Sequence, residues 1–566
     1  MLLLNPKKHV RKYPDERSRE IVLKTIEFFE KKGKVKLKED DHERLWYDDL
    51  LEFIKENNIF AQLITPKKYA DGDPDTRWDT WRACEFNEVL GFYGLHYWYT
   101  WQVSILGLGP IFMSENEEAK KKAAKFLREG GIFAFGLSEK EHGADVYNTD
   151  MILTKQDDGT YLANGYKYYI GNGNEAAMVS VFGKLADTDE YVFFAVDSQH
   201  ENYVCRRNLV NTQSYVSEFS LHDYPITEAD ILHKGKGAFH AALNTVNIGK
   251  YNLGWASVGI CTHALYESIT HASNRKLYGM MVTDFPHVKQ NFVDAYSRLT
   301  AMKLFGLRAS DYMRTASDED RRYLLYNPIM KMKVTTEGEK VINLLWDVIA
   351  AKGFEGDTFF EAAARDIRAL PKLEGTVHVN VALIIKFMPN FLFMPTEFPE
   401  IPTVDDPIDD EFLFNQGPTK GLGKIKFHDY NKAYNLFDLP NVNLFKEQID
   451  IFKQALMMAP PDKAQQKDID FLLSIGEIFT LIAYGQLILE NSKLLDVDEA
   501  MIDQIFDVFV RDFSKGALDV YLKTSSTDQQ KEFCMKMVRK PDNNPERYEK
   551  IWNEVHSLDG AYEMNK

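Results

Sequence analysis

Cysteine is scarce in this chain of 566 residues. The four cysteines, Cys84, Cys205, Cys261 and Cys534, lie far apart and form neither a CxxC metal pair nor a dense disulfide framework. Such sparse and scattered cysteine usage suits a reducing compartment.

Metal-binding motifs are also lacking. The run Asp71–Asp75 resembles the start of a calcium loop, but Thr76 and Arg82 stand where such a loop needs glycine and glutamate. We therefore expect no bound metal.

Positive charge is in deficit, with 68 Lys and Arg against 85 Asp and Glu and a formal net charge of −17. We expect no nucleic-acid partner, because phosphate binding needs a concentrated basic face.

Long apolar runs are equally rare. The most apolar stretch, Phe471–Leu489, contains Glu477 and Gln486, which favours a buried bundle helix over a membrane span. The N-terminal apolar run is too short for a signal peptide, so a cytoplasmic protein is expected.

What the chain does contain is enough apolar sequence for several globular domains, with 45% hydrophobic and 13% aromatic residues. Apolar residues at three-to-four spacing predict an N-terminal helical domain over residues 1–130. Short runs between Gly, Asn and Asp predict a β domain over 131–235. Long helical patterns return over 236–390. A proline-rich linker then leads to further helices within 391–566, so the predicted class is α+β.

Four short segments carry the most specific information: FGLSEKEHGAD at Phe135–Asp145, GYKYYIGNG at Gly165–Gly173, RKLYG at Arg275–Gly279 and RDIRALPKLEGT at Arg365–Thr376. Taken alone, each segment is explained by an ordinary structural role: a polar turn, an Asn-Gly hairpin, a solvated arginine or a helix end. Together, in this order and spacing, they resemble the signature segments of the acyl-CoA dehydrogenase family.

The resemblance implies the fold of that family and its FAD cofactor. The expected architecture is an N-terminal helical domain, a middle β-barrel domain and a C-terminal four-helix bundle. The residues beyond 390 are similar in size and helicity to the extra helical domain of the very-long-chain members, which are dimeric and membrane-associated. We therefore expect a homodimer, and the resemblance leaves open a peripheral membrane contact through these last helices.

In the family, the segments that match Phe135–Asp145 and Gly165–Gly173 line the flavin, so the resemblance implies the same role here. Ser138 matches a family Thr, and Tyr169 takes the place of the Trp that packs on the ring. Gly171 replaces a Thr, which removes one expected hydrogen bond near the reactive nitrogen of the flavin. The expected cofactor contacts in this region are Phe135, Leu137, Ser138, Gly143, Ala144, Tyr169, Ile170 and Gly171.

Further cofactor contacts are implied for the helical bundle. Arg275 matches the Arg that reaches the FAD pyrophosphate of the neighbouring subunit, a suitable partner for a guanidinium group. Tyr278 and Thr376 are also expected at the cofactor. Asp347 and Ala351 stand where the family has Gln and Gly.

Glu374 matches the family's catalytic base, which removes the α-proton of an acyl-CoA while the flavin accepts the β-hydride. Burial is expected to raise the pKa of this carboxylate. Some members carry the base on another helix, but that position is Gly249 here. The resemblance places Ala144, Lys250 and Gly375 at the substrate, and the aromatic run Phe92–Trp101 either fills the core or narrows the acyl pocket.

Three functions stay open. The first is a dehydrogenase that passes electrons from an acyl-CoA to an electron-transferring flavoprotein. The second is an acyl-CoA oxidase that uses oxygen. The third is a non-catalytic scaffold with the same fold, favoured by the departures at Gly171, Pro286 and Asp347.

Overall fold

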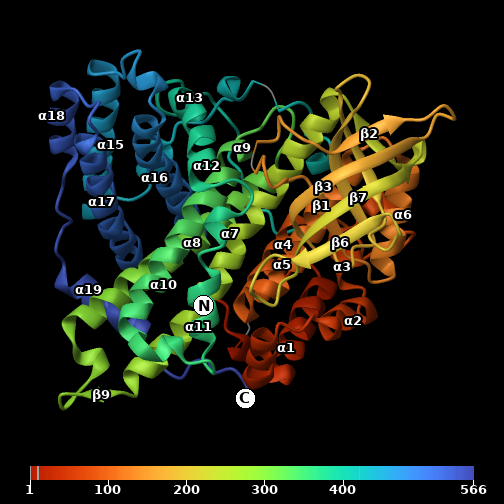
Figure 1. The fold of residues 1–566 in the computed structure, drawn as a ribbon. Helices are drawn as coiled ribbons and strands as arrows, with labels where there is room; N and C mark the ends of the chain where they lie inside the picture. The colour runs from red at the N-terminus through yellow and green to blue at the C-terminus, as the bar shows by residue number, and fades with distance from the viewer. Residues whose placement is uncertain (1, 9–11, 144, 420) are drawn as a thin grey trace. The chain divides into compact units, whose positions relative to one another are not determined.

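Helices and one curved sheet build the chain, and a computed structural model describes residues 2–8, 12–143, 145–419 and 421–566 (Figure 1). These residues form two compact units. One unit contains 253–404 and 421–563 with the N-terminal residues up to 10. The other contains 11–252 and 405–420 with the last three residues. We describe each unit separately.

The unit that contains residues 11–252 starts with six helices: α1 (Glu16–Glu43), α2 (Asp48–Glu56), α3 (Ile59–Ile64), α4 (Thr80–Tyr93), α5 (Leu95–Met113) and α6 (Glu117–Arg128). Asp15, Asp79 and Asn116 cap α1, α4 and α6 by accepting hydrogen bonds from backbone N–H groups of the first turns. The aromatic run predicted as core filling lies in α4 and α5, where Tyr97, Trp98 and Trp101 are fully buried.

One expected helix boundary in this region is wrong. The apolar spacing predicts a helix over 41–57, whereas α1 continues to Glu43 and α2 begins only at Asp48. Arg44 adopts a left-handed backbone conformation that ends α1, and its N–H donates to carbonyls of the preceding turn.

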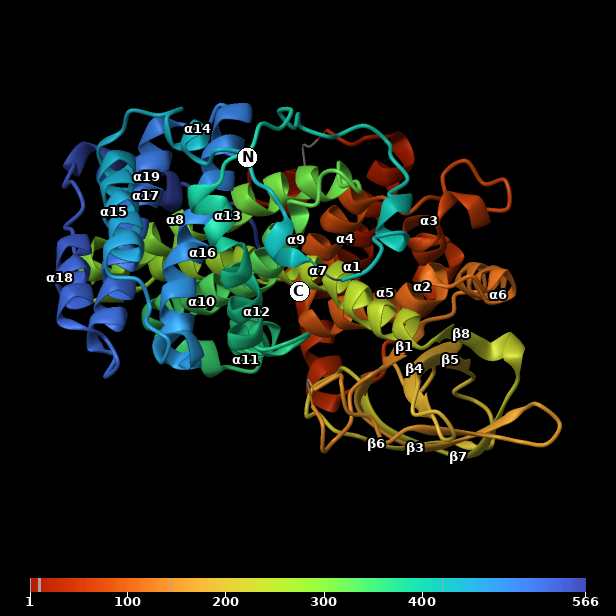
Figure 2. The ribbon, with the colours of Figure 1, turned by 90° about the horizontal axis from the view of Figure 1, so that it is seen from above.

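The predicted β domain is confirmed as a sheet of eight strands: β1 (Phe133–Gly136), β2 (Ile152–Lys155), β3 (Tyr161–Gly171), β4 (Met178–Leu185), β5 (Tyr191–Val196), β6 (Tyr203–Asn208), β7 (Val216–Ile226) and β8 (Ile231–Lys234). The strand order is β6-β7-β3-β2-β4-β5-β8, and β1 pairs with β4 in parallel. The sheet curls strongly, as Figure 2 shows for β3, β6 and β7. Its concave core holds residues such as Val181 and Phe219.

Helix α5 lies directly against β1. A Cβ atom at Gly107 would come within 2.7 Å of the Ala134 nitrogen, so only glycine permits this approach. The Ser104 hydroxyl accepts from the Phe133 N–H at 3.2 Å, and the Ser180 hydroxyl donates to the Gly107 carbonyl at 2.7 Å. The helix and the sheet are therefore held together by hydrogen bonds as well as by packing.

Helix α7 (Lys236–Ser273) runs from this unit into the other, which is mainly helical. The bundle helices are α8 (Pro286–Arg314), α9 (Tyr323–Ile329), α10 (Thr335–Ile349), α11 (Phe359–Asp366), α12 (Val377–Ile384) and α13 (Met388–Phe393). The additional C-terminal helices are α14 (Asn431–Tyr434), α15 (Pro440–Met458), α16 (Ile469–Leu494), α17 (Glu499–Leu522), α18 (Asp528–Met537) and α19 (Pro545–His556). A two-stranded hairpin, β9 (Lys276–Leu277) and β10 (Met280–Met281), follows α7.

The helix expected over 328–352 is interrupted. A π-helix, η5 (Met330–Val334), separates α9 from α10 just after Pro328, which has no N–H to donate to the preceding turn. The extra residue of the π-helix turn changes which side chains face inward. Lys331, which lies in this π-helix, is fully buried.

Helix α16 packs against α8, α12 and α17, as expected for a bundle helix. It is long and apolar enough to span a membrane by composition, but most of its residues are buried by the rest of the protein. Buried charges join these layers: Arg298 of α8 donates to Glu337 of α10 and makes a bidentate pair with Asp512 of α17 at 2.7 and 3.0 Å.

A second buried charge cluster surrounds Glu490 of α16. Its carboxylate accepts from Arg308 at 2.9 Å and from Tyr312 at 3.0 Å, and it lies 3.0 Å from His428 Nε2. Burial opposes the charge, but the His428 hydrogen bond and the Arg308 charge lower the pKa of Glu490 to about 2.

This shift predicts an acid-labile contribution to stability. Because the folded-state pKa lies below the unfolded value near 4.5, ionised Glu490 stabilises the fold above pH 4.5, by about 3 kcal/mol. The contribution is lost as pH falls from 4.5 towards 2. We expect Glu490→Gln to lower the urea midpoint at pH 7 and to reduce its dependence on pH below 5. The exposed Glu397→Gln is the control, and equal acid sensitivity of wild type and Glu490→Gln would contradict the assignment.

Candidate active site

The two signature segments of the β domain are hydrogen-bonded to each other. The Ser138 hydroxyl donates to the Tyr168 carbonyl at 2.7 Å, and the Tyr168 N–H donates to the Ser138 carbonyl at 3.0 Å. Sequence analysis expects the Ser138 hydroxyl at the cofactor, and in this structure it is engaged with β3. The backbone from Phe135 to Ser138 is thereby fixed along β3.

A buried ion pair reinforces this junction, and sequence analysis missed it. Lys167 Nζ donates to the Glu139 carboxylate at 2.6 Å and to the Leu137 carbonyl at 3.1 Å. Burial lowers the pKa of Lys167 to about 8 despite the Glu139 charge. Burial also opposes ionisation of Glu139, but Lys167 and the hydrogen bonds from Thr149 and Asp150 hold the pKa of Glu139 below its usual value. In the sequence, this ion pair is indicated only by Lys167 and Glu139, two charged residues within segments that are otherwise apolar or turn-forming.

Tyr169 is the residue expected to face a flavin ring. It has φ of 63° at a bulge between β3 and β7, and its side chain is 61% exposed. A left-handed backbone conformation costs a tyrosine roughly 1 kcal/mol or more and persists where the surrounding structure enforces it. The bulge turns this ring out of the sheet, whereas the neighbouring Ile170 side chain lies in the core.

The other expected contacts in this unit differ in accessibility. Phe135 is buried against Phe193, with ring centroids 5.9 Å apart, and Leu137 is half-buried. Gly143 is exposed with φ of 54°. Ala144 lies outside the described residues. Lys250 of α7 is buried, and the Gly249 carbonyl beside it accepts from Gln102 at 3.0 Å.

The candidate base, Glu374, lies in the other unit, in a loop between a short 3₁₀ turn (Leu370–Lys372) and α12. Glu374 has φ of 51° and Gly375 has φ of 86°, so two consecutive residues are left-handed. Thr376 is the N-cap of α12 and is exposed. The glycine adopts its positive φ at no steric cost, whereas the glutamate carries strain.

Lys331, from the π-helix, holds this loop from inside. Its ammonium donates to the Pro371 carbonyl at 2.7 Å and to the Gly375 carbonyl, one on each side of Glu374. Asn380 adds hydrogen bonds to the carbonyls of Gly375 at 3.2 Å and Thr376 at 2.9 Å. These contacts fix the backbone on which the Glu374 carboxylate is mounted, which is what a positioned base requires.

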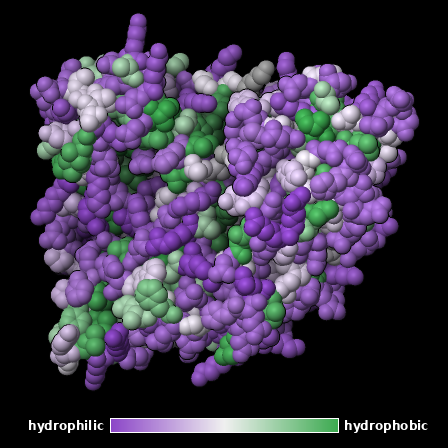
Figure 3. Space-filling view, viewed as in Figure 1, coloured by the Kyte–Doolittle hydropathy of each residue, from purple (hydrophilic) through white to green (hydrophobic). Residues whose placement is uncertain are grey.

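The residues expected at a second subunit's cofactor lie on the surface of the same unit. Asp347 and Ala351 are exposed, Arg275 is half-buried, and Tyr278 is 94% exposed. Tyr278 and Gly279 form the two-residue turn of the β9–β10 hairpin, and both have positive φ. Figure 3 shows apolar side chains gathered over this hairpin on an otherwise mainly hydrophilic face.

The C-terminal end of α7, beside Arg275, provides polar groups for a ligand. Within the described residues, His271 Nε2 and Ser273 Oγ are shielded from solvent and have no hydrogen-bond partner. Burial lowers the pKa of His271, and the charges of Arg275 and Lys352 lower it further, so both cations lie near the imidazole. Lys352 is paired with Glu355 at 2.6 Å, so Arg275 together with His271 Nε2 and Ser273 Oγ is the part that fits a group carrying phosphates.

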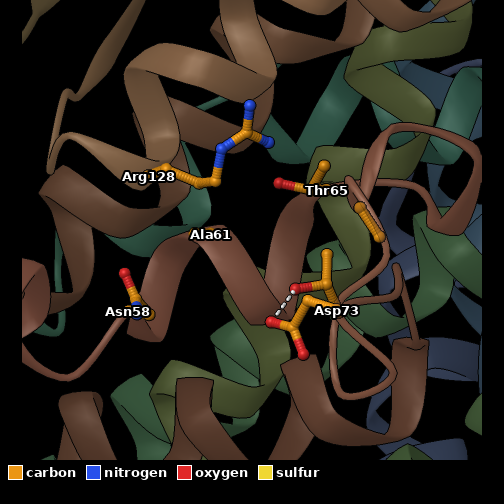
Figure 4. Close-up of a pocket in the computed structure, with 7 residues that line it drawn as sticks. Asn58, Ala61, Thr65, Asp73 and Arg128 are labelled. Carbon is orange, nitrogen blue, oxygen red and sulfur yellow. Dashed lines mark hydrogen bonds between the residues drawn. The ribbon is translucent and has the colours of Figure 1, made fainter.

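A small cavity is lined by residues that lie outside the four signature segments. It has a volume of about 50 Å³ and is lined by residues of α3, α6 and the Asp73 turn, including Thr65, Asp73 and Arg128 (Figure 4). This volume suits one or two water molecules.

The Lys331 contacts yield a prediction. Lys331→Met removes the ammonium donor of the Pro371 carbonyl and leaves the Gly375 carbonyl with Asn380, which we expect to destabilise the protein by on the order of 3 kcal/mol. Amide hydrogen exchange of Leu373–Thr376 should become faster. Lys372→Met is the control, because that ammonium is exposed and pairs with the carboxylate of Glu339. Unchanged exchange in Lys331→Met would show that the loop does not depend on this contact.

Comparison with known proteins gives two domain matches. Residues 134–219 match the acyl-CoA dehydrogenase middle domain, and residues 235–388 match the acyl-CoA dehydrogenase C-terminal domain. The second match includes Arg275, Glu374 and Thr376.

Individual relatives are distant. The chain is 23% identical to 3-(aryl)acrylate reductase of Clostridium sporogenes over 352 residues, which cover 60% of this chain and 91% of that protein. It is 24% identical to caffeyl-CoA reductase-Etf complex subunit CarC of Acetobacterium woodii over 286 residues, 49% of this chain and 73% of that one.

A solved structure extends the likeness of fold to nearly the whole chain. An acyl-CoA dehydrogenase complexed with FAD from Bacillus anthracis superposes with a TM-score of 0.75 at 18% sequence identity. The match covers 99% of this chain and 97% of that one, so it includes the additional C-terminal helices.

Proposed function

The chain belongs to the acyl-CoA dehydrogenase family, whose members are oxidoreductases, and on that premise we propose that it is an FAD-dependent enzyme acting on an acyl-CoA thioester. In the proposed reaction the α-proton passes to the Glu374 carboxylate, the β-hydrogen leaves as hydride, and a trans double bond forms between the two carbons. When bound, FAD supplies the acceptor for that hydride.

The observation that supports this assignment is the fixed loop of Glu374. An α-carbon next to a thioester is a weak acid, so its deprotonation needs a base held in place and a donor for the developing enolate oxygen. Lys331 and Asn380 fix the carbonyls of Pro371, Gly375 and Thr376 around the base. We assign the Glu374 side chain as base and its backbone N–H as the donor to the thioester oxygen.

The base assignment is tested with Glu374→Gln. We expect the variant to stay yellow and to lose bleaching by an acyl-CoA under anaerobic conditions, with a rate at least about 10³-fold below wild type. Stopped-flow absorbance of the flavin measures the bleaching rate. Glu339→Gln is the control: it makes the same Glu-to-Gln change elsewhere in the same unit and should leave the rate unchanged.

Two outcomes would contradict the proposal. Unchanged bleaching in Glu374→Gln would remove Glu374 as the base. A wild-type protein that is colourless and binds no FAD would favour a non-catalytic scaffold instead.

We propose further that a homodimer holds the cofactor, with one subunit providing Arg275 and Tyr278 to the FAD of the other. The β9–β10 hairpin supports this proposal, because Tyr278 is almost fully exposed on a strained turn and Phe354 is 69% exposed in the same unit. Contiguous exposed apolar patches mark interaction surfaces, and apolar side chains gather over this hairpin (Figure 3). The buried His271 Nε2 and Ser273 Oγ would pair with the phosphate-bearing part of the cofactor.

Arg275→Ala tests the cofactor contact. Loss of a charge-assisted hydrogen bond of roughly 1.5–3 kcal/mol should weaken FAD binding by about 10- to 100-fold. Equilibrium dialysis of FAD gives the dissociation constant, and the exposed Arg368→Ala serves as control. Equal FAD affinity in Arg275→Ala and wild type would count against the contact, whatever the oligomeric state.

The proposed electron acceptor is an electron-transferring flavoprotein. The Acetobacterium relative is named as a subunit of a complex with such a protein, which supports this partner. The test compares the rates at which an electron-transferring flavoprotein and air reoxidise the reduced flavin. Much faster reoxidation by the flavoprotein indicates a dehydrogenase, and fast reoxidation by air indicates an oxidase.

A further inference from the structure

One histidine and two carboxylates meet at the end of β1. The Nε2 atom of His142 lies 2.9 Å from Asp150 Oδ2 and 3.7 Å from Glu139 Oε2. The three atoms all lie within 4.8 Å of one another. These residues, which we call the Glu139–His142–Asp150 cluster, belong to the unit that contains residues 11–252.

The separations in this cluster fit the coordination sphere of a small divalent ion. Ligands arranged tetrahedrally at about 2.0–2.1 Å from Zn²⁺ lie roughly 3.3 Å from one another. The two distances from His142 Nε2, 2.9 and 3.7 Å, lie on either side of that value. One imidazole nitrogen with two carboxylate oxygens is also a ligand set that suits Zn²⁺.

A hydrogen bond explains only part of the cluster. A neutral imidazole with its proton on Nε2 donates to Asp150, but the distance to Glu139 is too long for a second hydrogen bond. One proton cannot serve two carboxylates, whereas one cation between the three atoms contacts both. In the other neutral tautomer, with the proton on Nδ1, His142 Nε2 carries a lone pair that can coordinate a metal.

Backbone hydrogen bonds hold the three side chains together. The Gly143 N–H donates to the Glu139 carbonyl at 2.9 Å, which closes a turn and brings His142 over Glu139. The Asp150 N–H donates to the Glu139 carboxylate at 2.7 Å, so the residues before β2 are tied to the same group. A donor set that is already assembled loses less conformational entropy when it binds a ligand.

The other oxygen of Glu139 is oriented by neighbouring side chains. Lys167 Nζ and the Thr149 hydroxyl both donate to Glu139 Oε1 at 2.6 Å, whereas Oε2 faces His142. Carboxylates that bind metals are commonly held by such hydrogen bonds. The Lys167 ammonium offsets one of the two carboxylate charges, and the other remains to attract a cation.

Solvent reaches the cluster from the side of Asp150. The Glu139 side chain is 6% exposed, that of His142 24% and that of Asp150 76%. An ion can therefore enter from water and retain a water molecule as its fourth ligand.

We propose that the Glu139–His142–Asp150 cluster binds one Zn²⁺ ion through Glu139 Oε2, His142 Nε2 and Asp150 Oδ2. Sequence analysis expects no bound metal, because the spacing Glu-x2-His-x7-Asp matches neither a CxxC pair nor a calcium loop. The bound ion links the end of the first signature segment to the residues before β2. This inference does not depend on the proposed function.

Titration of the full-length protein with Zn²⁺ alone tests the site. In isothermal titration calorimetry we expect His142→Gln to lose one binding site, or to weaken it at least about tenfold. His222→Gln is the matched control, because it removes an exposed imidazole of the same unit that lies on β7 beside the Ser220 hydroxyl. The control should bind Zn²⁺ as wild type does.

Asp150→Asn is a second variant, chosen because this side chain is mainly exposed and its loss should not prevent folding. It should weaken the same site. Zn²⁺ should also slow amide hydrogen exchange of residues 139–143 in wild type and in His222→Gln, but not in His142→Gln.

The zinc titrations decide between a built site and adventitious binding. Selective loss of one site in His142→Gln and Asp150→Asn would support the proposal. Equal stoichiometry and affinity in wild type and both variants would overturn it, and so would an equal loss in His222→Gln.

Discussion

A buried ammonium group fixes the loop that carries the proposed base. Lys331 has no exposed surface, and it donates to the carbonyls of Pro371 and Gly375 on either side of Glu374. A desolvated ammonium is costly unless it is hydrogen-bonded, so these two contacts oppose movement of the loop. Lys331 itself lies in the π-helix, and such bulges are frequent at functional sites.

Part of the backbone strain lies in segments that the family resemblance assigns to cofactor or substrate. Outside glycine, left-handed residues include Tyr169, Tyr278, Ala350 and Glu374, and each lies in a segment that the family resemblance assigns to cofactor or substrate. Such conformations persist where surrounding contacts enforce them, and they commonly mark functional positions. The strain at Glu374 is enforced by Lys331 and Asn380, and that at Tyr169 lies at a bulge beside the buried Lys167–Glu139 pair.

Local pattern predicted the strands β2, β3, β4, β5 and β7 and most helices, because their periodicity and turn residues are strong. It missed β1, which is buried on both faces and shows no alternation, the short strands β6 and β8, and the π-helix, which has no pattern of its own. Glu374 was predicted from a motif. The buried Lys167–Glu139 pair was not predicted, because it joins residues 28 positions apart and neither residue belongs to a local pattern.

The account's central claim is that this chain holds a flavin that an acyl thioester can reduce. An anaerobic titration of the purified protein with a panel of acyl-CoA thioesters measures this directly through the flavin absorbance. We predict bleaching by at least one thioester, with one trans-2-enoyl product formed per flavin. A protein that carries FAD and keeps its full absorbance with every thioester of the panel would contradict the account.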